Sequence, residues 1–332
     1  MSGPKVKVLL LAALSTGSTA LDCLAESGGF ETMLVTHGNT DASDFAPLID
    51  KAKELHVQTV LYGGRPVTIK PDGARILHHV DLPVAPDDDY LNSFASEFKP
   101  DVGLCIGWSK LLSARTLAIP RLGVIGHHES MLPKRRGRAP IVWPILHDCV
   151  ESGLSFFWLT EGVDDGDIFC QAPFPIGPRD TSADLLTKAN QVTRDLLLND
   201  VLPNLKAGNF KRTPQDHSQA TYCPRRTPDM GYIPWHESAE SIDRTVRALT
   251  KPYPGAFSWH RLRKIFIWQA RPVTPQEHHP DLVYQRAGTV VWVSENGARQ
   301  WVACGGGLLE IYLPVGRMKV GDRFDGQQYF EP

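Results

Sequence analysis

Several features that would assign the chain to a specialised class are missing from its sequence. No apolar run approaches the roughly 20 residues that a membrane-spanning helix needs. The six cysteines are far apart and form no C-x-x-C pair, which argues against a zinc ribbon or a disulfide framework and fits a reducing cytoplasm. We also find no internal repeat and no convincing cluster of metal ligands. We therefore expect a cytoplasmic protein that binds no metal and no membrane.

An excess of charge of either sign is absent as well. The chain carries 35 Lys and Arg against 37 Asp and Glu, so its formal net charge of −2 gives no argument for nucleic-acid binding. The apolar run within residues 5–14 has about the length of a signal-peptide core. A Gly/Ser/Thr turn and an amphipathic segment follow it, which favours a buried first strand instead.

The chain has 332 residues, which suffice for two domains with sizeable cores. Over about the first 200 residues, β-rich runs alternate with helical patterns, which is typical of an open, mostly parallel sheet with helices on both faces. Residues 64–84 interrupt this alternation, and a P-D-G turn between two apolar runs indicates an inserted hairpin. We predict an α/β catalytic domain over 1–207 and a polar, turn-rich linker over 208–230.

The C-terminal part of the chain, residues 231–332, has a different pattern. One helical segment, 238–250, is followed by short strands at regular spacing. This pattern predicts a small all-β barrel or sandwich with one helix.

One stretch, residues 123–140 (GVIGHHESMLPKRRGRAP), combines an apolar run, two histidines and a basic, glycine-broken loop. If GVIGH is a strand of the parallel sheet, His128 lies at its carboxyl end, where ligands bind in such folds. A histidine there can titrate near neutrality and act on a ligand. A hydrogen-bonded histidine without chemistry is the alternative.

An acidic loop, TEGVDDGDI (160–168), lies between two predicted strands. It is too short for a calcium loop, which alternates oxygen ligands over about a dozen residues. A solvated turn is the plain alternative. The functional interpretation is that Asp164 hydrogen-bonds His128, fixes its tautomer and stabilises its protonated form.

These segments together resemble the 10-formyltetrahydrofolate-dependent formyltransferases, with methionyl-tRNA formyltransferases and amino-sugar N-formyltransferases as the most similar branches. The resemblance rests on H-x-S-M-L-P-K-R-R-G-R-A-P-I and E-G-V-D-D-G-D-I, and continues through residues 179–185, 220–235 and 251–257. It implies a Rossmann-like, open, mostly parallel sheet domain followed by a small C-terminal, OB-like β-barrel. It also implies formyl transfer from 10-formyltetrahydrofolate, a cosubstrate, to a primary amine, without a metal.

The resemblance assigns catalytic roles to His128 and Asp164, but the third family position carries Gly126 instead of asparagine. That asparagine normally donates a hydrogen bond to the developing oxyanion, and losing one such donor typically costs ~10²–10³ in rate. His127, a backbone N–H freed by Gly126 or a water molecule could replace it. Alternatively, the chain is a catalytically weak, folate-binding relative.

The resemblance and the local sequence also assign binding residues. Those expected to hold the folate are Trp108, Lys110, Leu111, Thr160, Gly162 and Val163. Those expected to bind the acceptor are Ser130, Arg136, Arg138 and, in a turn that opens the first helix, Ser18. A phosphate or carboxylate is the expected partner of Arg136 or Arg138.

The amine acceptor is inferred from what the chain lacks. Residues 36–45 are short and acidic where methionyl-tRNA formyltransferases carry a basic insertion, which argues against tRNA and other nucleic acids. The R-R-T-P-D-M-G segment looks like the amino-sugar branch. We therefore expect a nucleotide-linked amino sugar, with methionyl-tRNA or a small amine such as hydroxyornithine as alternatives. A homodimer is left open.

Overall fold

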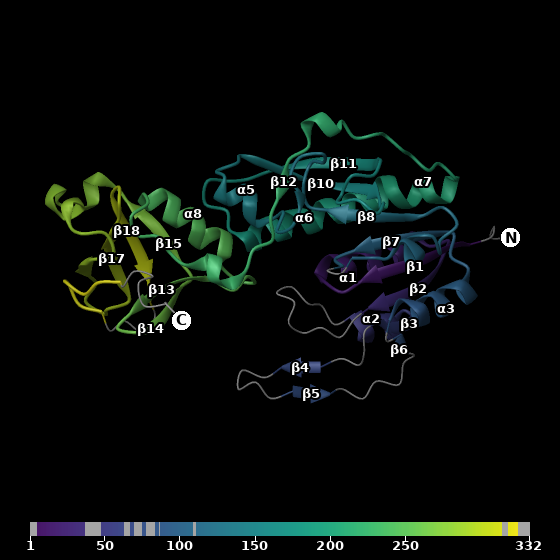
Figure 1. Ribbon diagram of the computed structural model, residues 1–332, viewed down its shortest axis with the longest axis horizontal. Coiled ribbons are helices and arrows are strands. Elements are labelled where there is room, and N and C mark those ends of the chain that lie inside the picture. Colours follow the sequence, from purple (N-terminus) through teal and green to yellow (C-terminus); the bar gives the residue numbers. More distant parts are fainter. Residues whose placement is uncertain are drawn as a thin grey trace. The chain divides into compact units, whose positions relative to one another are not determined.

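The computed structural model is drawn in Figure 1. The residues that it describes are 5–36, 48–62, 67–69, 75–77, 84–85, 87–108, 111–313 and 318–324. They fall into two compact units, each built from several segments. Unit 1 contains Met1–Pro140, Glu151–Pro175 and Thr187–Cys223, and unit 2 contains Ile141–Val150, Ile176–Leu186 and Pro224–Pro332. The domain boundaries suggested by the sequence stay a prediction.

An eight-stranded sheet forms the centre of unit 1, in the order β11-β10-β8-β7-β1-β2-β3-β6 (Figure 1). Its six parallel strands are β1(Val6–Ala12), β2(Phe30–Thr36), β3(Gln58–Tyr62), β6(Val84–Ala85), β7(Val102–Ile106) and β8(Val124–His128). β10(Glu151–Trp158) and β11(Ile168–Pro175) extend it in antiparallel fashion. The predicted open, mostly parallel sheet is therefore confirmed.

Burial explains why the first strand is an almost continuous apolar run. Residues 8–12 of β1 are fully buried, as expected for a strand of a parallel sheet that is covered on both faces. The helices of this part of the chain are α1(Ser15–Ser27), α2(Leu48–Glu54), α3(Asp88–Phe98), α4(Ala114–Leu117), α6(Ser182–Leu196), the π-helix η1(Leu197–Val201) and α7(Leu202–Ala207). The predicted inserted hairpin is confirmed by β4(Val67–Ile69) and β5(Arg75–Leu77), which pair antiparallel.

Two short strands complete unit 1, since β9(Arg136–Gly137) and β12(Tyr222–Cys223) pair in parallel. The short helix η2(His217–Gln219) precedes β12. All six cysteines are free, and burial raises the pKa of the Cys105 thiol to about 12, so this thiol stays protonated and unreactive at neutral pH.

Unit 2 contains the antiparallel β region that the sequence predicts. Its strands are β13(Ala256–His260), β14(Arg263–Ile267), β15(Ala270–Val273), β16(Val290–Val293), β17(Arg299–Ala303) and β18(Leu308–Tyr312). They pair as a four-stranded sheet, β15-β18-β17-β16, and a separate hairpin, β13-β14. The helices are α5(Val142–Leu146), η3(Pro228–Gly231), α8(Ala239–Leu249), η4(Pro275–Glu277) and η5(Pro280–Tyr284).

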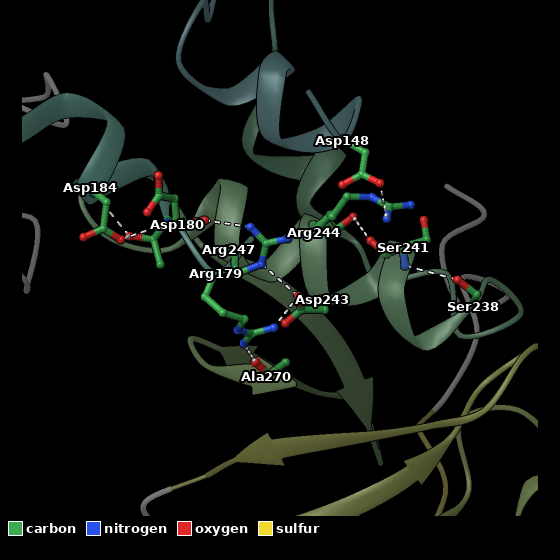
Figure 2. Close-up of polar contacts among 12 residues, drawn as sticks. Asp148, Arg179, Asp180, Asp184, Ser238, Ser241, Asp243, Arg244, Arg247 and Ala270 are labelled. Carbon is green, nitrogen blue, oxygen red and sulfur yellow. Dashed lines mark hydrogen bonds and ion pairs between the residues drawn. The ribbon is translucent and has the colours of Figure 1, made fainter. Parts of the chain in front are cut away.

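A buried carboxylate ties helix α8 to the 176–186 segment of unit 2 (Figure 2). The Asp243 side chain is 4% exposed, and its Oδ2 accepts hydrogen bonds of 2.8 Å from both Arg179 and Arg247. Arg247 also donates to the Asp180 carbonyl over 2.7 Å. Ser238 caps the helix by accepting from the Ser241 N–H. A charge that is this deeply buried needs such partners.

Candidate functional site

His128 is the last residue of β8, at the carboxyl end of a parallel strand of the large sheet. Its side chain is 7% exposed. The neighbouring His127 points to the opposite face, as strand alternation requires, and its Nε2 lies 2.9 Å from Thr193 Oγ1 on α6. Burial lowers the pKa of His127, so this ring is a neutral part of the core.

The basic loop fixes the tautomer of His128. Its Nε2 lies 2.8 Å from the Arg135 carbonyl oxygen, and because a carbonyl only accepts, Nε2 carries the proton. Arg135 has a φ of +58°, a left-handed conformation that is unfavourable for a long side chain and that recurs at functional sites. The lone pair of the neutral imidazole is therefore on Nδ1.

Asp164 faces that nitrogen from the acidic loop. Its Oδ2 is 3.8 Å from His128 Nδ1 and accepts a 2.7 Å hydrogen bond from the Gly137 N–H. The pair is thus at ion-pair distance, and the direct hydrogen bond expected from the sequence is not formed. The group that fixes the tautomer is the Arg135 carbonyl. The Asp164 carboxylate can still stabilise an imidazolium across this distance.

Gly126 does not open a space for a water molecule or a substitute donor, which corrects the expectation from the sequence. A Cβ atom added at this position would lie 2.4 Å from Leu159 Cδ2 and 3.2 Å from Phe157 Cε1. Leu159 therefore fills the space above the glycine. His127 cannot replace the missing asparagine either, because it lies on the other face of the strand.

The residues expected to hold the folate differ in how far they are exposed to solvent. Leu111 and Val163 are 88% and 54% exposed. Trp108 packs partly buried against the core of unit 1, with its ring centroid 5.7 Å from that of Tyr62. Lys110 lies outside the described residues.

The acidic loop is shaped by its own contacts. The Thr160 hydroxyl donates to the Asp165 carboxylate and accepts from the Gly162 N–H over 3.1 Å. A Cβ on Gly162 would lie 2.0 Å from Asp165 Oδ2, so any other residue here would displace the Asp165 side chain.

Two of the four residues expected to bind the acceptor, Ser130 and Arg136, are buried. Ser130 is fully buried and donates to the Lys134 carbonyl over 2.7 Å. Arg136 is 1% exposed, and its guanidinium is already surrounded by side chains of residues 215–222. Neither side chain is open to solvent in this structure. The sequence pattern of a basic loop does not reveal which cation turns inward.

The other two acceptor candidates differ from each other. Arg138 is exposed, and its N–H donates to the Cys223 carbonyl. Ser18 lies inside α1, where its N–H donates to the Leu14 carbonyl over 3.2 Å. The helix begins at Ser15, so the turn expected to open the helix is its first helical turn.

Several residues of the site could not be identified from the sequence. Their contributions are a carbonyl, an N–H and a buried amide, supplied by Arg135, Gly137 and Gln215. Backbone groups leave no sequence signal, and Gln215 falls in a segment that composition marks as a linker. Among the described residues, no group of three or more His, Cys, Asp and Glu side chains is placed to hold a metal ion. No helix of the described chain is long and apolar enough to cross a membrane.

Comparison with known families gives two matches. A model described as "Formyl transferase" matches residues 76–201, and one described as "Formyl transferase, C-terminal domain" matches residues 225–328. Together they cover well over half of the chain.

Solved structures share the fold at low sequence identity. An N-formyltransferase from Helicobacter canadensis, in complex with folinic acid and dTDP-3-aminofucose, is 16% identical with a TM-score of 0.64, covering 92% of this chain and 98% of that one. The methionyl-tRNA formyltransferase of Clostridium thermocellum is 17% identical with a TM-score of 0.52, covering 80% and 93%.

HypX from Aquifex aeolicus, in complex with tetrahydrofolic acid, is 16% identical with a TM-score of 0.59, covering 92% of this chain. The chain matches only 43% of the length of HypX. At these identities the structures show the fold alone.

Proposed function

Because the chain belongs to the formyltransferase family, we propose that it transfers a formyl group from 10-formyltetrahydrofolate to the primary amine of a nucleotide-linked amino sugar. One observation carries the chemistry. His128 lies at the carboxyl end of β8, and its Nε2–H donates a hydrogen bond to the Arg135 carbonyl. Its basic Nδ1 lies 3.8 Å from the Asp164 carboxylate. This is an arrangement for a general base with a stabilised conjugate acid.

The proposed reaction follows from that arrangement. The neutral amine attacks the formyl carbon, and its proton passes to His128 Nδ1 directly or through water. Asp164 stabilises the imidazolium, whose charge in turn stabilises the oxyanion of the tetrahedral carbon. The bond between the formyl carbon and N10 then breaks, and the imidazolium returns the proton to N10. The products are a formamide and tetrahydrofolate, and no other reactant is consumed.

The described residues fit a folate donor in one respect. Exposed apolar side chains, Leu111 and Val163, occur in the two segments that the resemblance assigns to the pterin. A pterin ring is flat and partly apolar, so contact with such side chains would remove their exposed area from water.

Two observations support an amino-sugar acceptor. The 36–45 segment is short and acidic, which suits a small acceptor better than the phosphate backbone of tRNA. The relative from H. canadensis was solved with dTDP-3-aminofucose.

A catalytically weak, folate-binding relative is the second candidate, and the position of Leu159 favours it. Leucine fills the space where the family carries an oxyanion donor, and no donor side chain replaces the asparagine on β8. Such a protein would bind the donor and turn over slowly or not at all.

The test is turnover of 10-formyltetrahydrofolate with a panel of amines: dTDP- and UDP-linked amino sugars, hydroxyornithine and methionyl-tRNA. We expect stoichiometric formamide and tetrahydrofolate with at least one nucleotide-linked amino sugar. Preferred formylation of methionyl-tRNA would overturn the assigned acceptor class. Donor binding without turnover of any amine would favour the second candidate.

A further inference from the structure

Residues 213–223 hold both loops of the candidate site in place. Thr213 pairs with Ile168, the last residue of the acidic loop, through backbone hydrogen bonds of 2.8 and 2.9 Å. At the other end of the segment, β12 pairs in parallel with β9 in the basic loop. Thr221 adds a side-chain contact, because its Oγ1 accepts from the Arg135 N–H over 2.8 Å. The segment therefore forms part of the site, although its composition is that of a linker.

Gln215 is the one side chain of this segment that contacts both loops. Its Nε2 donates to the Asp164 carbonyl over 2.9 Å and to the Gly166 carbonyl over 2.7 Å. Its Oε1 accepts from Arg136 Nε and from a terminal guanidinium nitrogen, over 3.2 and 2.6 Å. The side chain is buried, with 6% of the residue exposed. Both amide N–H groups and both oxygen lone pairs are thus used.

The donors and acceptors around the Gln215 amide fix the positions of its oxygen and its nitrogen. Carbonyl oxygens only accept and a guanidinium only donates, so the amide cannot be flipped without losing all four hydrogen bonds. Arg136 is itself held by Tyr222 Oη and by His217 Nδ1, each at 3.1 Å. Since a guanidinium only donates, both partners act as acceptors, and the arginine serves as a rigid multiple donor that orients Gln215.

The position of Gln215 determines where the acidic loop lies. Asp164 has a φ of +50°, so its backbone needs external contacts to hold it. Gly166 is packed so closely that a Cβ would lie 1.8 Å from the Trp158 carbonyl oxygen. The two Gln215 hydrogen bonds hold the loop between these points. From there, the Asp164 carboxylate meets the Gly137 N–H and faces His128.

We infer that Gln215 is a positioning residue for the proposed formyl transfer, which sets the separation of Asp164 and His128 through the backbone of residues 164–166. It is too deeply buried to contact a substrate and acts through Asp164. The inference rests on the proposed function for its kinetic consequence. Gln215 lies between the two ranges matched by the family models, 76–201 and 225–328.

Three variants test this role. Gln215→Met removes the donors and the acceptor at nearly constant size, and Gln215→Glu keeps the acceptor for Arg136 but cannot donate to the two carbonyls. Because Gln215→Glu retains a partner for the buried arginine, it remains informative where Gln215→Met folds poorly. The matched control is Gln219→Met, in the same segment, where the glutamine is exposed and its side chain bonds to no described residue.

Kinetics separate positioning from binding. Both Gln215 variants should lower kcat at least ~10-fold with KM for donor and amine within about threefold, and Gln219→Met should behave like the wild type. In an Asp164→Asn background, Gln215→Met should cause no further loss, because its effect passes through Asp164. Unchanged kcat in Gln215→Glu, or losses that multiply with Asp164→Asn, would overturn the inference.

A second measurement does not depend on activity. The ring resonances of His128, followed by NMR at fixed pH, should shift in both Gln215 variants and stay in place in Gln219→Met. If the wild type formylates no amine, the proposed function fails while this shift still supports the positioning role. If the resonances do not move, the positioning role fails even in an active enzyme.

Discussion

His128 is restrained by a carbonyl on one nitrogen and faces a carboxylate with the other. The Arg135 carbonyl keeps the proton on Nε2, which leaves Nδ1 to take up a proton near Asp164. This division of roles between two loops suits the proposed role of His128 as a general base.

The base can be removed with little change in shape. His128→Asn should lower kcat by about 10²–10⁴, since general base catalysis contributes that much, while the affinity for the folate donor changes little. Steady-state kinetics and donor titration by fluorescence check this. Turnover near that of the wild type would remove His128 from the mechanism.

At position 126, restoring the asparagine that the family carries should harm the protein instead of improving it. Gly126→Asn forces a side chain against Leu159 and should cost about 1–3 kcal/mol of stability by overpacking, with a lower kcat. Chemical denaturation and kinetics measure both quantities.

A double variant tests whether the loss of stability in Gly126→Asn comes from the contact with Leu159. Adding Leu159→Ala to Gly126→Asn should recover part of the lost stability, whereas Leu159→Ala alone should destabilise the protein. A gain in kcat for Gly126→Asn alone, without loss of stability, would mean that the glycine is a degraded position and would favour a weak relative.

At the scale of single elements, α8 depends on one buried carboxylate. Asp243→Ala should destabilise unit 2 by about 3–5 kcal/mol, because it leaves Arg247, whose side chain is 10% exposed, without its counter-charge. Arg179 is 54% exposed, so Arg179→Ala should cost less than about 1 kcal/mol. Urea denaturation distinguishes the two. Equal effects would contradict this burial argument.

Elements were more predictable than the contacts between them. Periodicity and turn signals sufficed for the parallel sheet, for the 64–84 hairpin and for the antiparallel strands of unit 2, because burial imposes these patterns on the sequence. They also placed His127 and His128 on opposite faces, through strand alternation. Neither pattern reports the space above a residue, so the contact of Leu159 with Gly126 could not be foreseen.

The inward turn of Arg136 illustrates the same limit. A run of four cations in five residues is usually solvated, and its composition is the same whether one of them is buried or not. Only the hydrogen bonds from residues 215–222 decide the matter, and these residues are some 80 positions away in the chain. The contacts of segment 213–223, which lies within the predicted linker 208–230, are hidden from the sequence for the same reason.

At the scale of the whole molecule, His127 makes folding stability depend on pH. Burial lowers its pKa below the ordinary 6.5 in the folded state, so the unfolded chain binds the proton more readily. Its contribution is complete above about pH 6.5 and is lost as the pH falls below it, by at most about 1.4 kcal/mol per pH unit. His127→Gln should flatten this slope in denaturation curves between about pH 5 and 6.5. An equally steep slope would assign the acid sensitivity elsewhere.

The overall charge bears on the acceptor. With a net charge of −2 and an acidic 36–45 segment, the protein should bind tRNA only weakly at physiological salt, and lowering the salt should help little. Filter binding across a salt series measures this. Tight binding with a steep dependence on salt would reveal a basic surface that the composition conceals.

The central claim is that His128 and Asp164 catalyse transfer of a formyl group to an amino sugar. Its most direct measurement is NMR of the reaction with ¹³C-formyl donor and a dTDP-linked amino sugar, for the wild type, His128→Asn and Asp164→Asn. The account predicts that the label moves to a formamide on the sugar nitrogen with the wild type, and that both variants form it at least ~10²-fold more slowly. Label that stays on the donor or appears as free formate with the wild type, or formamide produced at equal rates by the variants, would contradict it.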